Sequence, residues 1–133
     1  MIEILVISEN NTASEMIKTV NKVLGPRFVK NIHPLVIKSN YSKAKVCHLV
    51  QGKIRMFRKR IDGVLLLIEV FGSTQSNLCM DLLRDENIRL ISGYNLPMLI
   101  KAATLNQATP LKKLTPQLLS VGKKYIRTCD GRK

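Results

Sequence analysis

The stretch "GVLLLIEVFGSTQSN", Gly63 to Asn77, decides how this chain folds. Its five consecutive apolar residues, Val64 to Ile68, are typical of a strand that is covered on both faces, because a strand with one solvated face would alternate with polar residues. The chemistry changes abruptly at Glu69, where we predict that the chain leaves the core. Ligands of open α/β sheets bind at the carboxyl ends of the strands, so Glu69 is a candidate for a functional site.

Strand and helix patterns alternate along the whole chain. We predict four strands, at Ile2–Ile7, Pro34–Asn40, Val64–Ile68 and Ile88–Ser92. Helical patterns follow them, at Ala13–Leu24, from Ser42 to Ile61, from Thr74 to Arg84, after "GYNLPM" and in "LTPQLLSVGKKYI". This alternation predicts an α/β fold with a doubly wound, mainly parallel four-stranded sheet and helices on both faces.

The expected helix ends rest on local signals. Thr12 should cap the first helix, with Glu15 reaching back in a capping box, and Gly25 should end that helix. Pro97 suits the first turn of the fourth helix, because that turn needs no amide donor. In the last helix, Thr115 is the expected cap and Pro116 is expected in the first turn.

Length and composition restrict the function classes. With 133 residues, 45% of them hydrophobic, the chain fits one globular domain over residues 1–133. Its first apolar run contains Glu3, lacks a basic start and is too short to span a bilayer, so we expect a cytoplasmic protein without membrane insertion. Cys47, Cys79 and Cys129 form no CxxC pair, so neither a zinc site nor a disulfide framework is indicated.

Positive charge is the unusual bulk property, with 22 Lys and Arg against 9 Asp and Glu, a formal net charge of +13. In the second helix, the stripe expected to face the sheet consists of Cys47, Val50, Ile54, Phe57 and Ile61. The cations left toward solvent are Lys43, Lys45, Lys53, Arg55, Arg58, Lys59 and Arg60. Such a surface suits an acidic protein or a nucleic acid, although a charge run is also typical of a simply solvated face.

The segments "DGVLLLIEVFGSTQSN" and "LISGYNLPMLIKA" together resemble the IIA domain of the mannose-class bacterial sugar phosphotransferase system. In that family the third strand ends in an aspartate followed by Leu-Phe-Gly-Gly-Ser-Pro, and the fourth ends in Gly-Val-Asn-Leu-Pro-Met. The resemblance implies a dimer that often exchanges an added C-terminal strand. It also implies a cytoplasmic phosphorelay, in which the histidine phosphocarrier protein phosphorylates a histidine of the IIA domain, which then passes the phosphoryl group to a IIB domain for sugar uptake.

The chain departs from this family at the residue that carries the chemistry. The family's first strand ends in a Ser-His-Gly-like sequence, whereas "ISENN" places Glu9 at the acceptor histidine. Glu69 stands where the family has the aspartate that orients the histidine, and Thr74 keeps the hydroxyl of the family's serine. The phosphate cradle corresponds to Phe71, Gly72, Ser73 and Thr74.

Two functions follow from these matches and departures. The chain is either a IIA-like regulatory or protein-binding module that has lost the relay chemistry, or a working phosphotransferase whose acceptor lies elsewhere. His33 and His48 are the only histidines, and neither follows a strand at the expected edge, so structural or surface roles are expected for both. No cofactor is implied.

Glu9 and Glu69 could act together as a site or have separate, purely structural roles. Loops after the first and third strands of such a sheet usually open on the same edge, so we expect both side chains in one cleft. They would then form a general acid/base pair or bind a metal. Otherwise they point apart into water or accept hydrogen bonds from amides at the helix starts.

Overall fold

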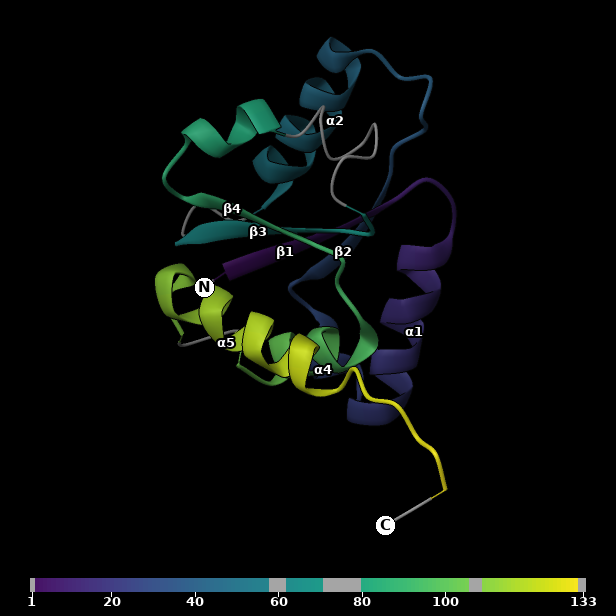
Figure 1. The fold of residues 1–133 in the computed structure, drawn as a ribbon. Coiled ribbons are helices and arrows are strands. Elements are labelled where there is room, and N and C mark those ends of the chain that lie inside the picture. Colours follow the sequence, from purple (N-terminus) through teal and green to yellow (C-terminus); the bar gives the residue numbers. More distant parts are fainter. Residues whose placement is uncertain (1, 58–61, 71–79, 106–108, 132–133) are drawn as a thin grey trace.

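The structure, a computed structural model, describes residues 2–57, 62–70, 80–105 and 109–131. Its four strands are β1 (Ile2–Ser8), β2 (Ile32–Val36), β3 (Gly63–Ile68) and β4 (Ile88–Ser92). All three pairings between them are parallel, and they form one sheet in the order β2-β1-β3-β4 (Figure 1). The predicted fold class is therefore confirmed, with a sheet that is entirely parallel in the described residues.

Helices cover both faces of the sheet, as predicted. The α-helices are α1 (Thr12–Leu24), α2 (Lys43–Met56), α4 (Leu96–Leu105) and α5 (Leu111–Lys124), and the short 3₁₀ helices are η1 (Pro26–Val29) and η2 (Met80–Arg84). In Figure 1, α2 and η2 lie on one face, whereas α1, α4 and α5 lie on the other. None of the helices in the described part of the chain is long and apolar enough to span a bilayer.

The two central strands explain why the apolar run has no polar alternation. Every residue of β1 and of β3 is buried, because helices cover both of their faces. In β1, Ile4 and Val6 pack into the core that contains α1, α4 and α5, whereas Leu5 and Ile7 pack into the core beneath α2. The edge strands are only partly buried, which is why their sequences mix apolar and polar residues.

The start of α1 differs from the prediction. Thr12 is the first helical residue rather than the cap, and Asn11 occupies the cap position without a side-chain hydrogen bond. The Asn10 side-chain oxygen accepts the backbone N–H of Thr12 at 3.0 Å, a short local turn that the asparagine side chain favours. Glu15 forms an ion pair with Lys18 at 3.1 Å, so the capping box is wrong. The end of α1 at Gly25, with φ of 104°, agrees with the prediction.

The start of α5 is also earlier than predicted. Pro110 stands at the cap and the helix begins at Leu111, so Thr115 and Pro116 lie inside it. The Thr115 hydroxyl donates to the Leu111 carbonyl at 2.9 Å instead of capping the helix. The extra turn buries Leu111 and a further leucine of the same face, and this burial outweighs the hydrogen bond that Pro116 cannot form.

Three further boundaries differ. The second strand is Ile32–Val36 rather than Pro34–Asn40, and proline is tolerated there because β2 is an edge strand. Helix α2 begins after the Ser42 cap, whose hydroxyl accepts the Lys45 N–H at 3.1 Å, and it buries Val46 in place of the predicted Cys47. It ends before Phe57, and Ile61 lies outside the described residues. Of the predicted third helix, Met80–Arg84 is a 3₁₀ helix and the preceding residues lie outside the described ones.

Candidate functional site

The carboxyl edge of the sheet is the candidate site. Parallel register pairs Ile7 with Ile68 and Ile68 with Ser92, so β1, β3 and β4 end side by side. The loops that follow these strands, which begin at Glu9, Glu69 and Gly93, therefore start from one edge, as the sequence predicts.

Buried Ser8 fixes the loop that follows β1. Its hydroxyl donates to the Asn10 carbonyl at 2.6 Å and accepts the Ala13 N–H at 3.2 Å, which ties the strand end to the first turn of α1. Glu9 is exposed, and its carboxylate accepts the backbone N–H of Ser39 at 3.1 Å. This carboxylate therefore contacts the loop that follows β2.

Glu69 is associated with the opposite side of β1, next to β4. The Gly93 N–H donates to the Ile68 carbonyl at 2.9 Å, and the positive φ of Gly93, 73°, turns the chain toward Tyr94. Burial raises the pKa of Tyr94 to about 12, and the negative charge of Glu69 acts in the same direction. Glu69 thus affects the pKa of Tyr94 on the β4 side of the sheet. Glu9, in contrast, accepts its hydrogen bond from Ser39 on the β2 side. The shared cleft remains a prediction.

Tyr94 is the residue at this edge that sequence reasoning missed. Its hydroxyl is buried and has no hydrogen-bond partner among the described residues. The available signal was the sequence "GYNLPM", which has a tyrosine where the resembling family has a valine. Tyr94 therefore places a hydroxyl group where the family's valine has only apolar atoms.

Asn95 organises the start of α4. Its side-chain oxygen accepts the Met98 N–H at 3.0 Å, while its side-chain nitrogen donates to the Gly122 carbonyl of α5 at 2.9 Å. Pro97 occupies the first turn, as predicted. The motif "NLPM" therefore caps one helix and fastens it to the next.

An open pocket of about 500 Å³ lies between the β1–α1 loop and α4. Its lining includes Asn10, Asn11, Thr12, Glu15 and Leu96. These residues offer amide and hydroxyl groups and one carboxylate, and no Lys, Arg or His of the described ranges lines the pocket. Glu9 and Glu69 do not line it either. The pocket can form hydrogen bonds to a polar ligand, but its own side chains supply no positive charge to an anion.

Both histidines lie away from this edge. His33 in β2 is 2.8 Å from the Glu3 carboxylate through Nε2, and its ring packs against Phe57 with centroids 4.8 Å apart. Glu3, near the start of β1, is only 8% exposed. His48 is exposed on α2. Their positions agree with the predicted structural and surface roles, although no local pattern indicated that His33 would contact a buried carboxylate.

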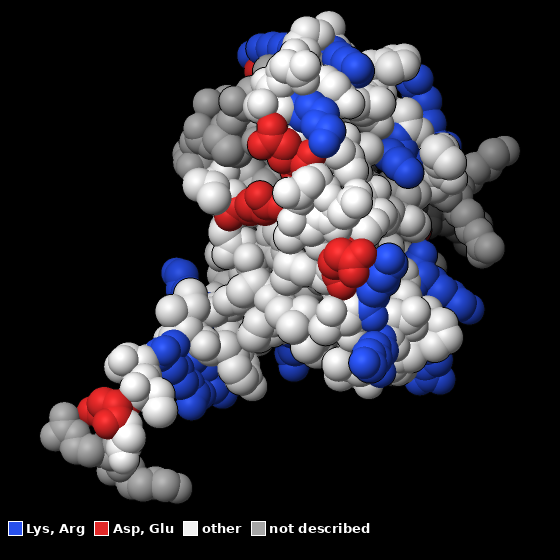
Figure 2. Space-filling model, turned by 90° about the vertical axis from the view of Figure 1, so that its right-hand side faces the viewer, with Lys and Arg blue, Asp and Glu red and all other residues white. Residues whose placement is uncertain are grey.

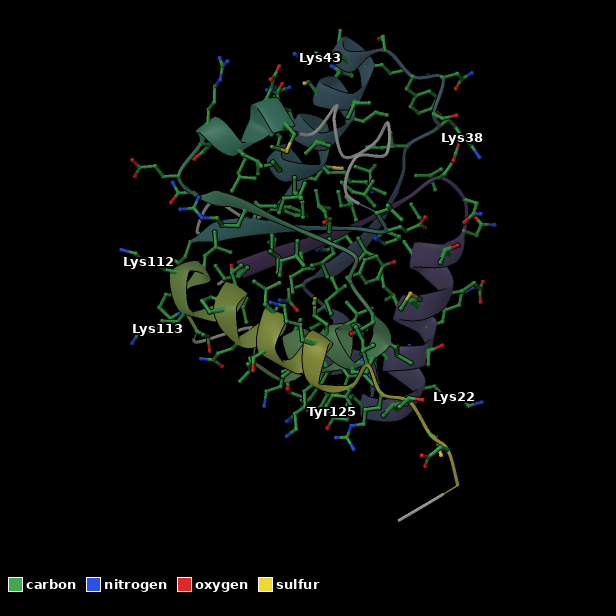
Figure 3. The ribbon with its side chains drawn as sticks, viewed as in Figure 1. Lys22, Lys38, Lys43, Lys112, Lys113 and Tyr125 are labelled. Carbon is green, nitrogen blue, oxygen red and sulfur yellow. The ribbon has the colours of Figure 1, made fainter. Side chains whose placement is uncertain are left out.

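The predicted basic surface is only partly described. Lys43, Lys45 and Arg55 of α2 are exposed and Lys53 is half-buried, whereas the predicted partner residues Arg58, Lys59 and Arg60, like the cradle Phe71–Thr74, lie outside the described residues. Figure 3 shows Lys43 on α2, on the other side of the sheet from α5. Its ammonium group pairs with Asp81 of η2 and, mainly through this hydrogen bond, lowers the pKa of the Asp81 carboxyl.

Positive charge is also found far from α2. On the face drawn in Figure 2, Lys and Arg side chains lie at the upper and lower ends, with acidic side chains between them. No group of three or more His, Cys, Asp or Glu that could hold a metal ion occurs within the described ranges. On this face, the basic side chains are therefore interrupted by acidic ones.

Comparison with known proteins agrees with the architecture. Solved structures with the same fold include the phosphotransferase system component EIIA of Streptococcus agalactiae, at 19% identity and a TM-score of 0.81, covering 96% of this chain and 97% of that one. The mannose/sorbose specific IIA subunit of Enterococcus faecalis is 20% identical with a TM-score of 0.75, covering 98% and 96%. The IIA protein associated with the fucose utilization operon of Streptococcus pneumoniae is 16% identical with a TM-score of 0.80, covering 96% and 92%.

At the level of sequence, no curated protein gives a significant match. The family model EIIA-man, described as "PTS system fructose IIA component", matches residues 3–118, most of the chain. The chain therefore belongs to the mannose-class family of phosphotransferase-system IIA components.

Proposed function

We propose that this IIA-family protein is not phosphorylated at the end of β1 and acts as a regulatory or protein-binding module of the phosphoenolpyruvate-dependent sugar phosphotransferase system. The observation that carries the proposal is Glu9, which follows β1 at the position of the family's acceptor histidine. Its carboxylate accepts a hydrogen bond from the Ser39 N–H. A histidine suits a reversible relay because its ring nitrogen is nucleophilic near neutral pH, and Glu9 has no such nitrogen.

Electrostatics at this edge also oppose phosphoryl transfer. An incoming phosphoryl group would approach Glu9 on a surface where Glu69 follows the neighbouring strand, and the described lining of the adjacent pocket contains Glu15 and no Lys or Arg. Phosphoryl transfer is catalysed chiefly by positive groups and donors that offset the developing negative charge. The competing function, an active phosphocarrier, therefore requires an acceptor other than Glu9.

The negative charge of Glu9 would give this protein a surface like that of a phosphorylated relative. A carboxylate at the end of β1 places negative charge where a phosphorylated relative would carry it, close to the start of α1. A partner that distinguishes the phosphorylated from the free IIA protein would bind this chain as if it were phosphorylated. The histidine phosphocarrier protein or a IIB domain would be such a partner, and a second copy of the chain would form a homodimer with it, all in the cytoplasm of a bacterium.

A second candidate function is favoured by the net charge of +13. Exposed Lys43, Lys45 and Arg55 on α2 could bind nucleic acid or another polyanion, and such binding would weaken steeply as salt is added. Lys43 already pairs with Asp81, which reduces the charge available for a partner. We therefore rank this function below the protein-binding module.

Intact-mass measurement tests the main proposal. The purified chain is incubated with phosphoenolpyruvate, enzyme I and the histidine phosphocarrier protein, beside a mannose-class IIA protein that has its acceptor histidine. We expect the mass of the control to rise by one phosphoryl group and the mass of this chain to stay unchanged. A stoichiometric gain on the wild-type chain would refute the proposal.

Two variants at Glu9 test separately the missing nucleophile and the negative charge. If Glu9→His alone gains a phosphoryl group, the missing nucleophile is the reason for inactivity. Glu9→Gln removes the charge while keeping the size, so it should weaken binding to the IIB domain or the histidine phosphocarrier protein in calorimetry, whichever the wild type binds. Equal affinity of the wild type and Glu9→Gln would eliminate the role of the charge.

A further inference from the structure

A groove of about 400 Å³ lies between α4 and α5. The two helices lie side by side on one face of the sheet (Figure 1). The apolar part of the groove is contributed by Pro97, Ile100, Val121 and the ring of Tyr125, and apolar atoms make up most of its lining. A groove of this composition is suited to apolar side chains.

Contacts between the two helices hold the groove open in a defined shape. The Asn95 side chain donates to the Gly122 carbonyl at 2.9 Å, which fastens the start of α4 to the last turns of α5. At Gly122 the helices come so close that a Cβ atom there would lie 2.6 Å from the terminal carbon of Met98. Because the scaffold is already ordered, a ligand would not have to organise it on binding.

Apolar surface continues beyond the groove at the end of α5. Tyr125, which lines the groove, is 56% exposed, and the next residue, Ile126, is 74% exposed. Large apolar side chains that gather next to an apolar groove indicate a surface that another molecule covers, whereas scattered ones would not.

The charges around the groove define the chemistry of that molecule. Lys101 and Lys124 contribute to the lining, and none of the acidic residues that the structure describes does. Arg127 follows closely and lies 5.8 Å from the centre of the Tyr125 ring. An occupant must therefore combine apolar side chains for the groove with carboxylates for the lysines.

The described helices of a second copy do not meet that requirement. Among the described helices, α1 contains one acidic residue, Glu15, η2 contains one, Asp81, and the remaining helices contain none. Two such basic copies would repel each other at this surface. A nucleic acid would bring negative charge, but it would leave the apolar lining without apolar groups to cover it.

We propose that the α4–α5 groove binds an acidic amphipathic helix of a partner protein. Apolar side chains spaced three and four residues apart would fill the groove, as in other complexes where a helix binds between helices. Asp or Glu residues on the flanks would pair with Lys101 and Lys124. Glu9 does not belong to this binding site, so the proposal does not depend on whether the chain is phosphorylated.

Selection from a phage-displayed library of random peptides tests the predicted chemistry. The full chain is immobilised, and enriched peptides are synthesised with a fluorescent label and titrated in solution. We expect enrichment of sequences that place Leu, Ile or Phe at helical spacing next to Asp and Glu. Enrichment of basic sequences, or no common pattern, would overturn the proposal.

Two matched double variants then locate the site. Lys101→Glu with Lys124→Glu reverses the charges of the groove, whereas Lys112→Glu with Lys113→Glu makes the same change in net charge at the other end of α5, where both lysines are exposed (Figure 3). We expect the groove variant to bind the selected peptides roughly tenfold more weakly and the control to bind nearly as the wild type does. Circular dichroism confirms that both variants fold.

Three outcomes would contradict the proposal. An equal loss in both variants would show general electrostatic attraction rather than a site. Displacement of the peptides by duplex DNA or single-stranded RNA with higher affinity would assign the surface to nucleic acid. Concentration-dependent self-association in sedimentation experiments, abolished by the groove variant, would assign it to a second copy of the chain.

Discussion

Replacing Tyr94 by Phe should stabilise the protein. The Tyr94 hydroxyl is buried without a hydrogen-bond partner among the described residues, and burial of an unpaired polar group costs about 1–3 kcal/mol. Phenylalanine keeps the ring that packs against the core and removes only the hydroxyl. We therefore expect the free energy of unfolding to rise by about 1 kcal/mol, which for a chain of this length corresponds to an increase in Tm of about 4 °C.

Urea unfolding at neutral pH measures this change. The slope of the free energy against urea concentration should stay the same, so that the shift in midpoint reports stability alone. Tyr125→Phe is the matched control, because its ring is exposed and its effect should remain within about 0.5 kcal/mol. A Tyr94→Phe variant that is less stable than the wild type would refute the reasoning, because it would show that the hydroxyl has a stabilising partner.

The same phenol predicts a pH dependence. The pKa of Tyr94 is raised from 10.0 to about 12 in the folded protein, mainly by burial and further by Glu69. Between these values the unfolded chain loses a proton that the folded protein retains, so stability is complete below pH 10 and falls as the pH rises toward 12. The loss attributable to Tyr94 is about 2 kcal/mol at most, since the residue is partly exposed and solvent screens it. Tyr94→Phe should show a smaller loss than the wild type over this range, measured by urea unfolding at each pH.

Two further substitutions test contacts elsewhere. Asn95→Ala removes both the cap of α4 and the hydrogen bond to Gly122, so it should lower the free energy of unfolding by about 2 kcal/mol, whereas Asn95→Asp keeps the cap and should cost about half as much; no loss in Asn95→Asp on urea unfolding would mean that the link to α5 adds nothing. Glu3→Ala leaves His33 without its partly buried partner and should cost about 2 kcal/mol, and Glu3→Gln should cost less because it still accepts a hydrogen bond; a thermal unfolding midpoint unchanged in Glu3→Ala would contradict this.

The fold could be predicted because its strongest signals are local. An unbroken apolar run such as Val64–Ile68 is typical of a strand that is covered on both faces, and the alternation of strands with helices then leaves few topologies. Helix starts were less predictable. Asn10, Asn11 and Thr12 are all good capping residues, and the choice among them depends on contacts of Ser8 that the sequence does not reveal.

The location of the candidate site at the edge of the sheet could be predicted, but the individual contacts of its residues could not. Parallel strands bring Glu9 and Glu69 to one edge, which follows from topology. The contacts of Glu9 with Ser39 and of His33 with Glu3 depend on how β2 aligns with β1, and no local pattern determines that register. The missing partner of the Tyr94 hydroxyl is likewise a property of packing in three dimensions.

The central position of β1 in the sheet affects how the chain folds while it is being synthesised on the ribosome. Of the four strands of this sheet, β1 is synthesised before the others, and it is a central strand with β2 and β3 as its neighbours. A nascent chain that has not yet released Gly63–Ile68 therefore keeps one edge of β1 unpaired, with the apolar side chains of Ile2–Ser8 uncovered. Such an edge is open to pairing with other chains, so the period of synthesis between the first and the third strand is when this protein most needs protection from aggregation.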